Sequence, residues 1–411
     1  MYTAQRDSAL NVLRNRSNVN QIKEYMLQRA VTQQYNLAFT GGTDNSSYYI
    51  SGNYTKDQPI YKSNKATSYN LNANFKNDFL RKRLTLNTGI VYGCQSAQVN
   101  NVALQTLGVG TFGSAPYDQL VDDNGNKVYT GSTYTERVSD SLARTKNLLP
   151  YTYNAIDELD YNHTITNKNN IRLNASLKGV LTNWLNVTVS GQYQKTILDQ
   201  VNNKNLNSYL TRDLINNSTN TANITNTSFL RINAVPKGGV YRTSRGLSDD
   251  YGLRGQLNAD KNFGEDHHFD AILGTEIREA KYEGSEQALY GYDEQRSTSV
   301  PVSTVVHYAT LTNSRSRLPN LGMLFKSRTR YLSYYGNGTY SYLNRYFVSG
   351  SFRFDDINIL GVDRRDRARP LWSSGLRWDI KREVFLQDVN WISSLSIRGT
   401  IGTTPPPIIV K

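Results

Sequence analysis

Cysteine and histidine are scarce in this chain of 411 residues, which limits the chemistry that it can perform. The single cysteine, Cys94, excludes a disulfide framework within the chain and a cysteine-rich metal cluster, so we interpret it as a buried or incidental thiol. Of the four histidines, only His267 and His268 are neighbours, and they stand beside Asp266. A histidine pair without a third spaced ligand is weak evidence for metal binding or acid–base catalysis, and a solvated turn explains it better.

Motifs of other active sites are missing as well. No glycine-rich phosphate loop follows a strand and opens a helix, and no nucleophile elbow occurs. We therefore expect a protein that is not an enzyme and that needs no metal or cofactor.

Long hydrophobic runs are also missing. No apolar run approaches the roughly 20 residues that a membrane-spanning helix needs. The N-terminal MYTAQRDSAL has no charged start followed by an apolar run, so we expect the export signal to be missing from this chain. Only 38% of the residues are hydrophobic, and the mean hydropathy of −0.58 argues against a large soluble core. If the chain spans a membrane, it must do so as a closed β-barrel whose interior is polar and hydrated.

Charge and aromatic content favour the same class of protein. The net charge of +13 could indicate nucleic-acid binding, but lysine and arginine are scattered through strands and loops rather than gathered in a helix or stripe. We therefore expect no nucleic-acid partner. The chain has 29 tyrosines against 12 phenylalanines, and tyrosine is the aromatic residue that suits the border between lipid and water.

The clearest pattern is residue-by-residue alternation of apolar and polar side chains in RYLSYYGNGTYSYLNRYFVSGSFRFD, residues 330–355. Tyr346, Val348 and Phe352 fall on one face of a strand, whereas Ser349 and Arg353 fall on the other. A few residues around 343–344 separate the two halves. The segment therefore predicts a β-hairpin with one apolar face and one mostly polar face.

Similar alternation predicts about twelve strands between residues 35 and 402. Their connections are short and long in turn: short at 41–45 and very long at 94–167, with further long excursions ending near 249 and spanning about 283–327. Short periplasmic turns and long extracellular loops distinguish antiparallel transmembrane β-barrels. This alternation of short and long connections places both termini on the extracellular side. A complete single-chain barrel ordinarily begins and ends at the periplasm, so we expect a section of a larger barrel wall.

Charged residues at polar positions of the alternation are candidates for the lumen-facing side. An arginine facing lipid at the midplane would cost about 2 to 4 kcal/mol, so the alternation must turn such residues inward. There they could line the lumen, contact protein that fills it or pair across strands. The candidates are Arg172, Arg254, Asp260, Glu276, Arg353, Asp355, Arg377, Asp379 and Arg398. Loop aromatics that could stack on a ligand are Tyr117, Tyr151, Tyr153 and Tyr161.

Several stretches resemble one known family. QQYNLAFTGGTDNSSYYISGNYTKDQPI, SAPYDQLVDDNGNKVY, the 330–355 hairpin and the strand pair from Trp372 to Thr400 are similar, in this order, to the barrel wall of SusC/RagA-type TonB-linked outer-membrane transporters. The resemblance implies a 22-stranded barrel in outer-membrane lipid, plugged by an N-terminal domain. It also implies a SusD-like surface lipoprotein, energy from the TonB system, and import of oligosaccharides or peptides.

The chain departs from that family pattern in lacking a plug, a TonB-contacting segment and the family's terminal strands. We expect residues 1–34 to be a remnant of an extracellular loop, 35–402 to be a partial barrel, and 403–411 to be a tail foreign to the family. On this view the chain is truncated and does not transport alone. The alternative is a complete small outer-membrane barrel acting as an enzyme or adhesin.

Overall fold

The computed structural model describes residues 3–108, 112–131, 134–146, 148–220, 234–311, 314–320, 322–358, 370–386 and 388–403. Of the predicted C-terminal tail, only Thr403 lies within the described residues.

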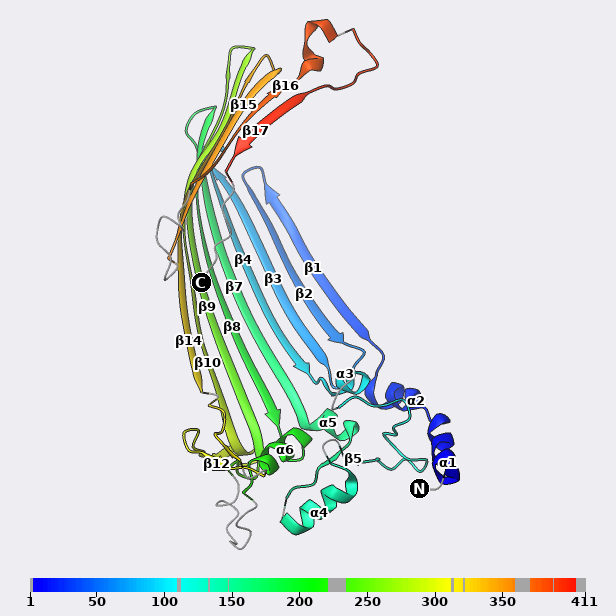
Figure 1. Ribbon diagram of the computed structural model, residues 1–411. Helices are drawn as coiled ribbons and strands as arrows, with labels where there is room; N and C mark the ends of the chain where they lie inside the picture. Colours follow the sequence, from blue (N-terminus) through cyan, green and yellow to red (C-terminus); the bar gives the residue numbers. More distant parts are fainter. Residues whose placement is uncertain are drawn as a thin grey trace.

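One large antiparallel sheet dominates the structure (Figure 1). Twelve strands follow one another along it, which confirms the predicted fold class and strand number, and β11 (Thr298–Val300) adds to β10 at its side. The twelve are β1 (Val31–Thr43), β2 (Ser46–Gln58), β3 (Lys65–Phe79), β4 (Leu84–Val99), β7 (Asn162–Val180), β8 (Leu185–Lys204), β9 (Gly239–Phe263), β10 (His267–Asp293), β14 (Met323–Tyr342), β15 (Tyr346–Ile357), β16 (Leu371–Trp378) and β17 (Ile397–Gly402). Among the described strands, β1 pairs only with β2 and β17 only with β16, so the sheet is open at these two edges.

The register places apolar residues of neighbouring strands side by side. Val348 of β15 lies opposite Tyr340 of β14 and Leu376 of β16, whereas Arg353 lies opposite Tyr335. Because directly opposed residues share a face, the alternation in each strand builds one apolar and one polar face across the sheet. The apolar face is open to its surroundings, and Leu273 at its centre is 53% exposed.

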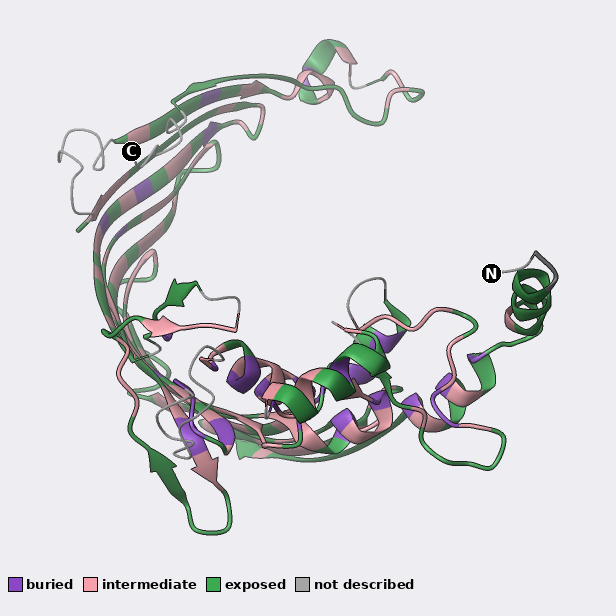
Figure 2. Cartoon of the chain, turned by 60° about the horizontal axis from the view of Figure 1, so that its bottom comes forward, coloured by how far each residue is buried: buried purple, intermediate pink, exposed green. Residues whose placement is uncertain are grey.

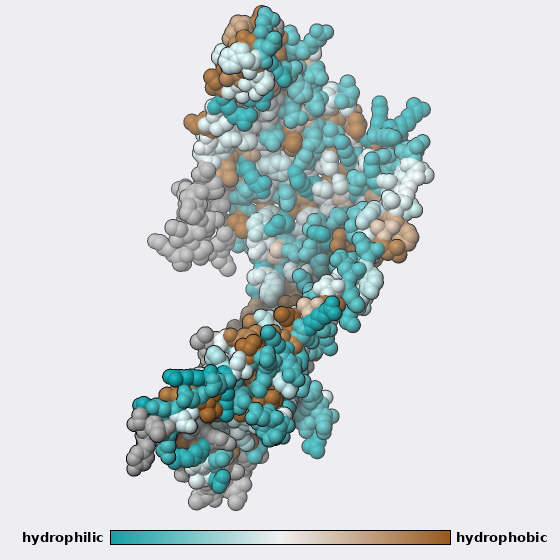
Figure 3. Space-filling model, turned by 90° about the vertical axis from the view of Figure 1, so that its right-hand side faces the viewer, coloured by the Kyte–Doolittle hydropathy of each residue, from teal (hydrophilic) through white to brown (hydrophobic). Residues whose placement is uncertain are grey.

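The polar face is the concave one. The sheet curves around short helices that lie inside the curve (Figure 2). Gln200 and Asn202, at polar positions of β8, line one cavity together with Gln105 and Leu210 from two of these helices. Seen from the open side of the curve, the surface is mainly hydrophilic (Figure 3). The exposed apolar face is therefore convex, as in a barrel wall that meets lipid outside and water inside.

The helices gather at the end of the sheet where the long connections lie (Figure 1). They are α1 (Thr3–Arg14), α2 (Val19–Gln21), the π-helical turn η1 (Ile22–Met26), α3 (Val102–Leu107), α4 (Glu136–Lys146), α5 (Ala155–Tyr161) and α6 (Tyr209–Asn217). Two-stranded pieces β5 (Thr130–Gly131) with β6 (Thr152–Tyr153) and β12 (Tyr308–Ala309) with β13 (Arg315–Ser316) also belong to long connections. Between β16 and β17 lie the 3₁₀ turns η2 (Ile380–Arg382) and η3 (Val384–Leu386). None of the helices within the described ranges is long and apolar enough to cross a membrane.

Short turns close most of the opposite end of the sheet, where the longer β16–β17 connection with η2 and η3 also lies (Figure 1). β14 and β15 are joined through Leu343 and Asn344, which both have φ of 52°. Two consecutive left-handed residues give a turn whose twist matches that of the flanking strands, at a steric cost that is larger for leucine than for asparagine. The predicted position of this turn is confirmed.

Several predicted strand ends are wrong. β10 continues to Asp293 and β14 begins at Met323, so much of the predicted 283–327 excursion is paired strand. β9 likewise begins at Gly239 rather than near 249. The residues by which these strands exceed the prediction do not alternate between apolar and polar, but their backbones continue the hydrogen-bonded pairing with the neighbouring strands. β16, in contrast, ends at Trp378, so Asp379 follows the strand instead of belonging to it.

The assignment of the two faces predicts that a charged side chain is tolerated on the concave face and destabilises the protein on the convex face. Leu273→Arg places a guanidinium on the convex face and should lower the free energy of unfolding in lipid vesicles by about 2 to 4 kcal/mol. Ile272→Arg makes a change of similar size one residue away, on the concave face opposite Asn258 and Asn337, and should cost clearly less. Urea unfolding of the two variants measures this difference, and equal losses would contradict the assignment of the faces.

Candidate ligand-facing wall and loop platform

A hydrogen-bonded cluster around Tyr335 lies on the concave face. Arg254 Nε donates to the Tyr335 hydroxyl, and the Arg254 guanidinium carbon lies 4.9 Å from the Tyr335 ring centroid. The Tyr335 hydroxyl donates to Gln256 Oε1 at 2.9 Å. Gln256 Nε2 donates to Asn258 at 2.5 Å, and Asn258 Nδ2 donates to Asn186 at 2.9 Å. These contacts make a polar ladder across β8, β9 and β14.

Four of the predicted lumen-facing residues meet at this cluster. Arg353 lies directly opposite Tyr335, and its Nε donates to Asp355 Oδ2 at 2.7 Å. Glu276 lies opposite Arg254 in the register of β9 and β10. Arg254, Glu276, Arg353 and Asp355 therefore alternate in sign within one patch, although 101 positions separate Arg254 from Asp355 in numbering. We name these four residues with Tyr335 and Gln256 the wall cluster.

The other predicted wall residues lie apart from the wall cluster. Arg377 binds Asp379 at 2.6 Å and stacks 4.0 Å from the Phe347 ring centroid. Arg398 lies directly opposite Arg377, so two positive charges face each other at the β17 edge. The remaining two are Asp260, which is 3.8 Å from His268 Nδ1, and Arg172, which lies opposite Val91 and Gln194. Their role in lining a lumen stays a prediction.

The two neighbouring histidines do not converge. Consecutive residues of a strand point to opposite faces, which separates His267 from His268. His267 contacts the Tyr340 hydroxyl at 2.5 Å, and His268 contacts Asn262 Oδ1 at 2.8 Å. Each ring therefore has its own cross-strand partner.

Beyond the wall, the long connections form a packed layer that we name the loop platform, made of residues 18–26, 100–108, 112–121, 148–161 and 205–218. Apolar side chains from η1, α3 and α5, together with one from the connection between α3 and β5, make one buried cluster, which consists of Ile22, Met26, Val102, Ala103, Leu120, Ala155 and Leu159. Buried amides join the pieces. Asn100 Nδ2 donates to the carbonyls of Glu158 and Leu159, at 3.0 and 2.9 Å. Asn154 caps α5 and donates to the carbonyls of Leu120 and Val128, at 2.9 and 2.8 Å.

Glu158 connects α5 to α6. It is 3% exposed and accepts hydrogen bonds from Ser208 Oγ at 2.9 Å and from the backbone N–H of Tyr209. Burial raises the pKa of the Glu158 carboxyl above its usual range, and these two hydrogen bonds and the nearby Arg212 only partly offset the effect. Asn100, Asn154 and Glu158 were not predicted, because nothing in so polar a sequence separates them from their solvated neighbours.

The predicted loop tyrosines have unequal access to a ligand. Tyr117 is 47% exposed, whereas Tyr151 is 1% exposed and packs edge-on against Tyr134. Tyr153 packs against Phe112 and borders a cavity of about 250 Å³ that Asp118 and Asn154 also line. Tyr161 is half-buried at the end of α5. Tyr117 and Tyr153 are therefore the better candidates for ligand contact, since Tyr151 is enclosed by protein.

Comparison with known proteins gives related sequences. No family model matches the chain. An 80-residue stretch is 39% identical to the TonB-dependent receptor SusC of Bacteroides thetaiotaomicron, covering 20% of this chain and 8% of SusC. Over 391 residues the chain is 23% identical to the TonB-dependent receptor P39 of Formosa agariphila, covering 93% of this chain and 31% of P39. The chain thus spans less than a third of the length of these curated relatives.

The fold recurs in solved structures. The RagAB peptide transporter matches with a TM-score of 0.66 at 17% identity, over 93% of this chain and 38% of that chain. The RagAB peptide importer in its "open-open" state matches with a TM-score of 0.67 at 16% identity, over 93% and 37% of the two chains. The two curated relatives are named as receptors, and the two RagAB structures are named as a peptide transporter and a peptide importer.

The raised pKa of Glu158 predicts a pH dependence of the loop platform. Because the folded pKa lies above the unfolded value, the stabilisation is complete below the unfolded pKa and is lost as the pH rises through the folded pKa. The docking of α6 should therefore weaken as the pH rises above about 4.5, the ordinary value for a glutamate carboxyl. Glu158→Gln carries no charge and should remove this slope.

Hydrogen exchange of the α6 amides, referenced at each pH to free peptides, measures the effect. The matched control is Asp160→Asn, which neutralises an exposed carboxylate of the same helix and should keep the wild-type slope. A wild-type profile that matches Glu158→Gln at every pH would show that the carboxylate is not responsible.

Proposed function

We propose that this chain, a stretch of barrel wall of the SusC/RagA type of TonB-dependent receptor, serves in an outer-membrane importer of peptides or oligosaccharides. The observation that carries the proposal is the pairing of an exposed apolar convex face with a polar concave face beneath packed loops. A wall of this kind separates lipid from a hydrophilic passage.

The wall cluster suits contact with a plug or a passing ligand. It presents guanidinium, carboxylate, amide and phenol groups within one patch, so it can exchange hydrogen bonds with backbone or hydroxyl groups of many ligands. In a plugged barrel most of the inner wall faces protein, which favours the plug as its usual partner. We propose that the wall cluster holds the plug and is uncovered when the plug moves.

The loop platform suits ligand capture at the outer surface. Tyr117 is exposed, and Tyr153 borders a cavity that Asp118 also lines. Aromatic rings next to polar groups can stack on sugar rings or receive peptide side chains. We propose that a SusD-like surface lipoprotein covers this end and that the TonB system supplies the energy for import.

A complete small barrel acting as an enzyme or adhesin is not supported. The described strands leave the sheet open at β1 and β17. The curated relatives are named as receptors, and the matching RagAB structures are named as a peptide transporter and importer.

Uptake by the native organism tests the proposal and the role of the wall cluster together. Deletion of the gene should abolish import of at least one class of labelled peptide or oligosaccharide, and the complementing gene should restore it. Tyr335→Phe removes the hydroxyl that joins Arg254 to Gln256, so import should change by about two- to tenfold, as expected for one hydrogen bond.

Tyr334→Phe is the matched control, because Tyr334 is the neighbouring residue on the convex face. It should import at the wild-type rate with the same amount of protein in the membrane. Import of both ligand classes that is unchanged by gene deletion would contradict the proposed function. Equal rates for the two tyrosine variants would contradict only the role of the wall cluster.

A further inference from the structure

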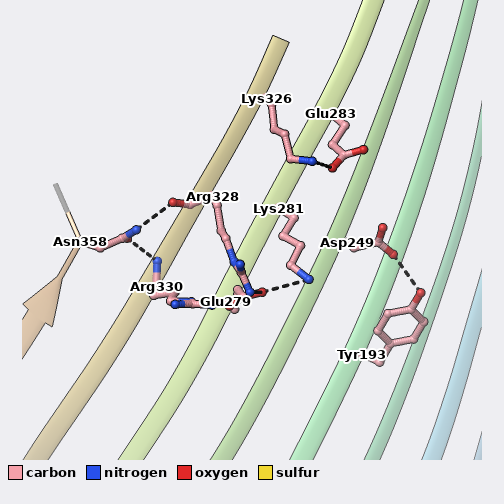
Figure 4. A network of polar contacts seen from close by, with 9 residues as sticks. All are labelled: Tyr193, Asp249, Glu279, Lys281, Glu283, Lys326, Arg328, Arg330 and Asn358. Atoms are coloured by element: carbon pink, nitrogen blue, oxygen red, sulfur yellow. Dashed lines mark hydrogen bonds and ion pairs between the residues drawn. The ribbon is translucent and has the colours of Figure 1, made fainter. Parts of the chain in front are cut away.

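We infer that the convex face binds a phosphate-bearing lipid of the outer leaflet, through a cluster of cations at the long-loop border of its apolar belt. The cluster consists of Lys281, Lys326, Arg328 and Arg330 around Glu279 and Glu283, on β10 and β14 (Figure 4). We name it the border cluster. The inference rests on the outer-membrane location that the proposed function includes.

The position of the border cluster follows from the alternation of side chains between the two faces of β10. Apolar residues occupy the convex face of β10 from Phe269 to Ile277, with Thr275 the one polar residue among them, and Glu279 is the next residue on that face. A tilted strand needs about 9 to 11 residues to cross a bilayer, which this belt supplies. Two residues further along a strand is about 7 Å, so Glu279 lies at headgroup level. The long β10–β14 connection lies beyond it, which places the border cluster at the extracellular leaflet.

Glu279 organises three of the cations. Its Oε1 lies 2.9 Å from Arg328 Nη2 and 3.1 Å from Lys281 Nζ, and its Oε2 lies 2.5 Å from Arg330 Nε. The Glu279 side chain is 18% exposed, whereas those of Lys281, Arg328 and Arg330 are 37%, 48% and 56% exposed. The carboxylate therefore lies beneath, and the cationic groups face outward.

The strand geometry under the two arginines is also fixed. Asn358, just past the end of β15, accepts a hydrogen bond from the Arg330 N–H at 2.6 Å and donates to the Arg328 carbonyl at 2.9 Å. Both arginines are thus held on an ordered backbone where β15 no longer continues beside them. Because Glu279 contacts both guanidinium groups, the pair is also preorganised at its side chains and loses less conformational entropy when it binds an anion.

The charges on this surface do not balance. Lys195 continues the same surface at 3.9 Å from Asp249, and Lys326 binds Glu283 at 2.6 Å. The five cations Lys195, Lys281, Lys326, Arg328 and Arg330 share this stretch of the convex face with four carboxylates, Asp249, Glu279, Glu283 and Asp356, which leaves a net charge of +1. Guanidinium groups have more N–H donors than one carboxylate can accept, and their fork matches the oxygens of a phosphate.

A lipid headgroup is the occupant that suits this location. The border cluster is continuous with the apolar belt, so a molecule that covers the belt with its acyl chains brings its headgroup to the cations. Tyr193 and Tyr251 lie at the same border, where Tyr193 donates to Asp249 at 2.9 Å and Lys281 lies 5.3 Å from the Tyr251 ring centroid. Tyrosine at an interface supports the same placement.

The test uses the receptor purified from the outer membrane of its own organism and placed in phosphatidylcholine nanodiscs. Diphosphoryl lipid A is the probe, and dephosphorylated lipid A and inorganic phosphate are the comparison ligands. The double variant R328Q/R330Q should bind the probe roughly 10- to 30-fold more weakly, since each cation near a lipid surface contributes a few-fold in affinity.

The matched control is the double variant R242Q/R278Q, which removes the same charge from the concave face of β9 and β10. Arg278 lies 4.7 Å from the Tyr331 ring centroid, and Arg242 lines the cavity beneath the loop platform. This control should bind the probe as the wild type does. Heat-modifiable migration of all three proteins shows that each barrel has inserted.

Weaker probe binding by R328Q/R330Q alone supports the inference. Equal probe binding by the two double variants overturns it, as does equal binding of dephosphorylated lipid A. Inorganic phosphate that binds as tightly as the probe overturns the lipid assignment. A wild-type receptor that is found outside the outer membrane would contradict the proposed function instead.

Discussion

The structure depends on one constraint, which is that every backbone N–H and C=O of a strand crossing lipid must find its partner in a neighbouring strand. The long antiparallel ladders between β1 and β17 meet this need without helices for the strands that lie between the two open edges. Since successive side chains of a strand point to opposite faces, the same ladder assigns each residue to lipid or to the concave side. The positions of the wall cluster, the loop platform and the border cluster all follow from this geometry.

The sequence was sufficient to predict the main sheet because the lipid imposes a strict pattern. Positions such as Leu273 and Val348 had to be apolar, and their neighbours Ile272 and Ser349 did not. The prediction failed where that demand stops. β10 and β14 continue as paired strands beyond Glu283 and Ser327, in water, where backbone hydrogen bonds still stabilise the ladder but either face accepts polar residues. Apolar alternation therefore marks the membrane belt rather than the full strand.

The candidate site was predictable in part, for the same reason. The inward phase of Arg254, Glu276, Arg353 and Asp355 could be read from each strand alone. Their meeting around Tyr335 depends on the registers of three strand pairs, which no local pattern gives. The loop platform was less predictable still, because its buried Asn100, Asn154 and Glu158 resemble solvated residues until their distant partners are known. The border cluster is visible in the sequence, because Glu279, Lys281 and Glu283 place charged residues at the alternate positions that are apolar earlier in β10.

The most direct test of this account is the accessibility of spin labels placed singly at each position from 267 to 285 of β10, in a Cys94→Ala background in lipid. Oxygen collides preferentially with labels in the hydrocarbon, and a water-soluble nickel chelate collides with labels in water. The account predicts a period of two from 269 to 277, with odd positions accessible to oxygen, and loss of oxygen preference at odd positions from 279 onward. An absence of alternation, or high oxygen accessibility at even positions, would contradict it.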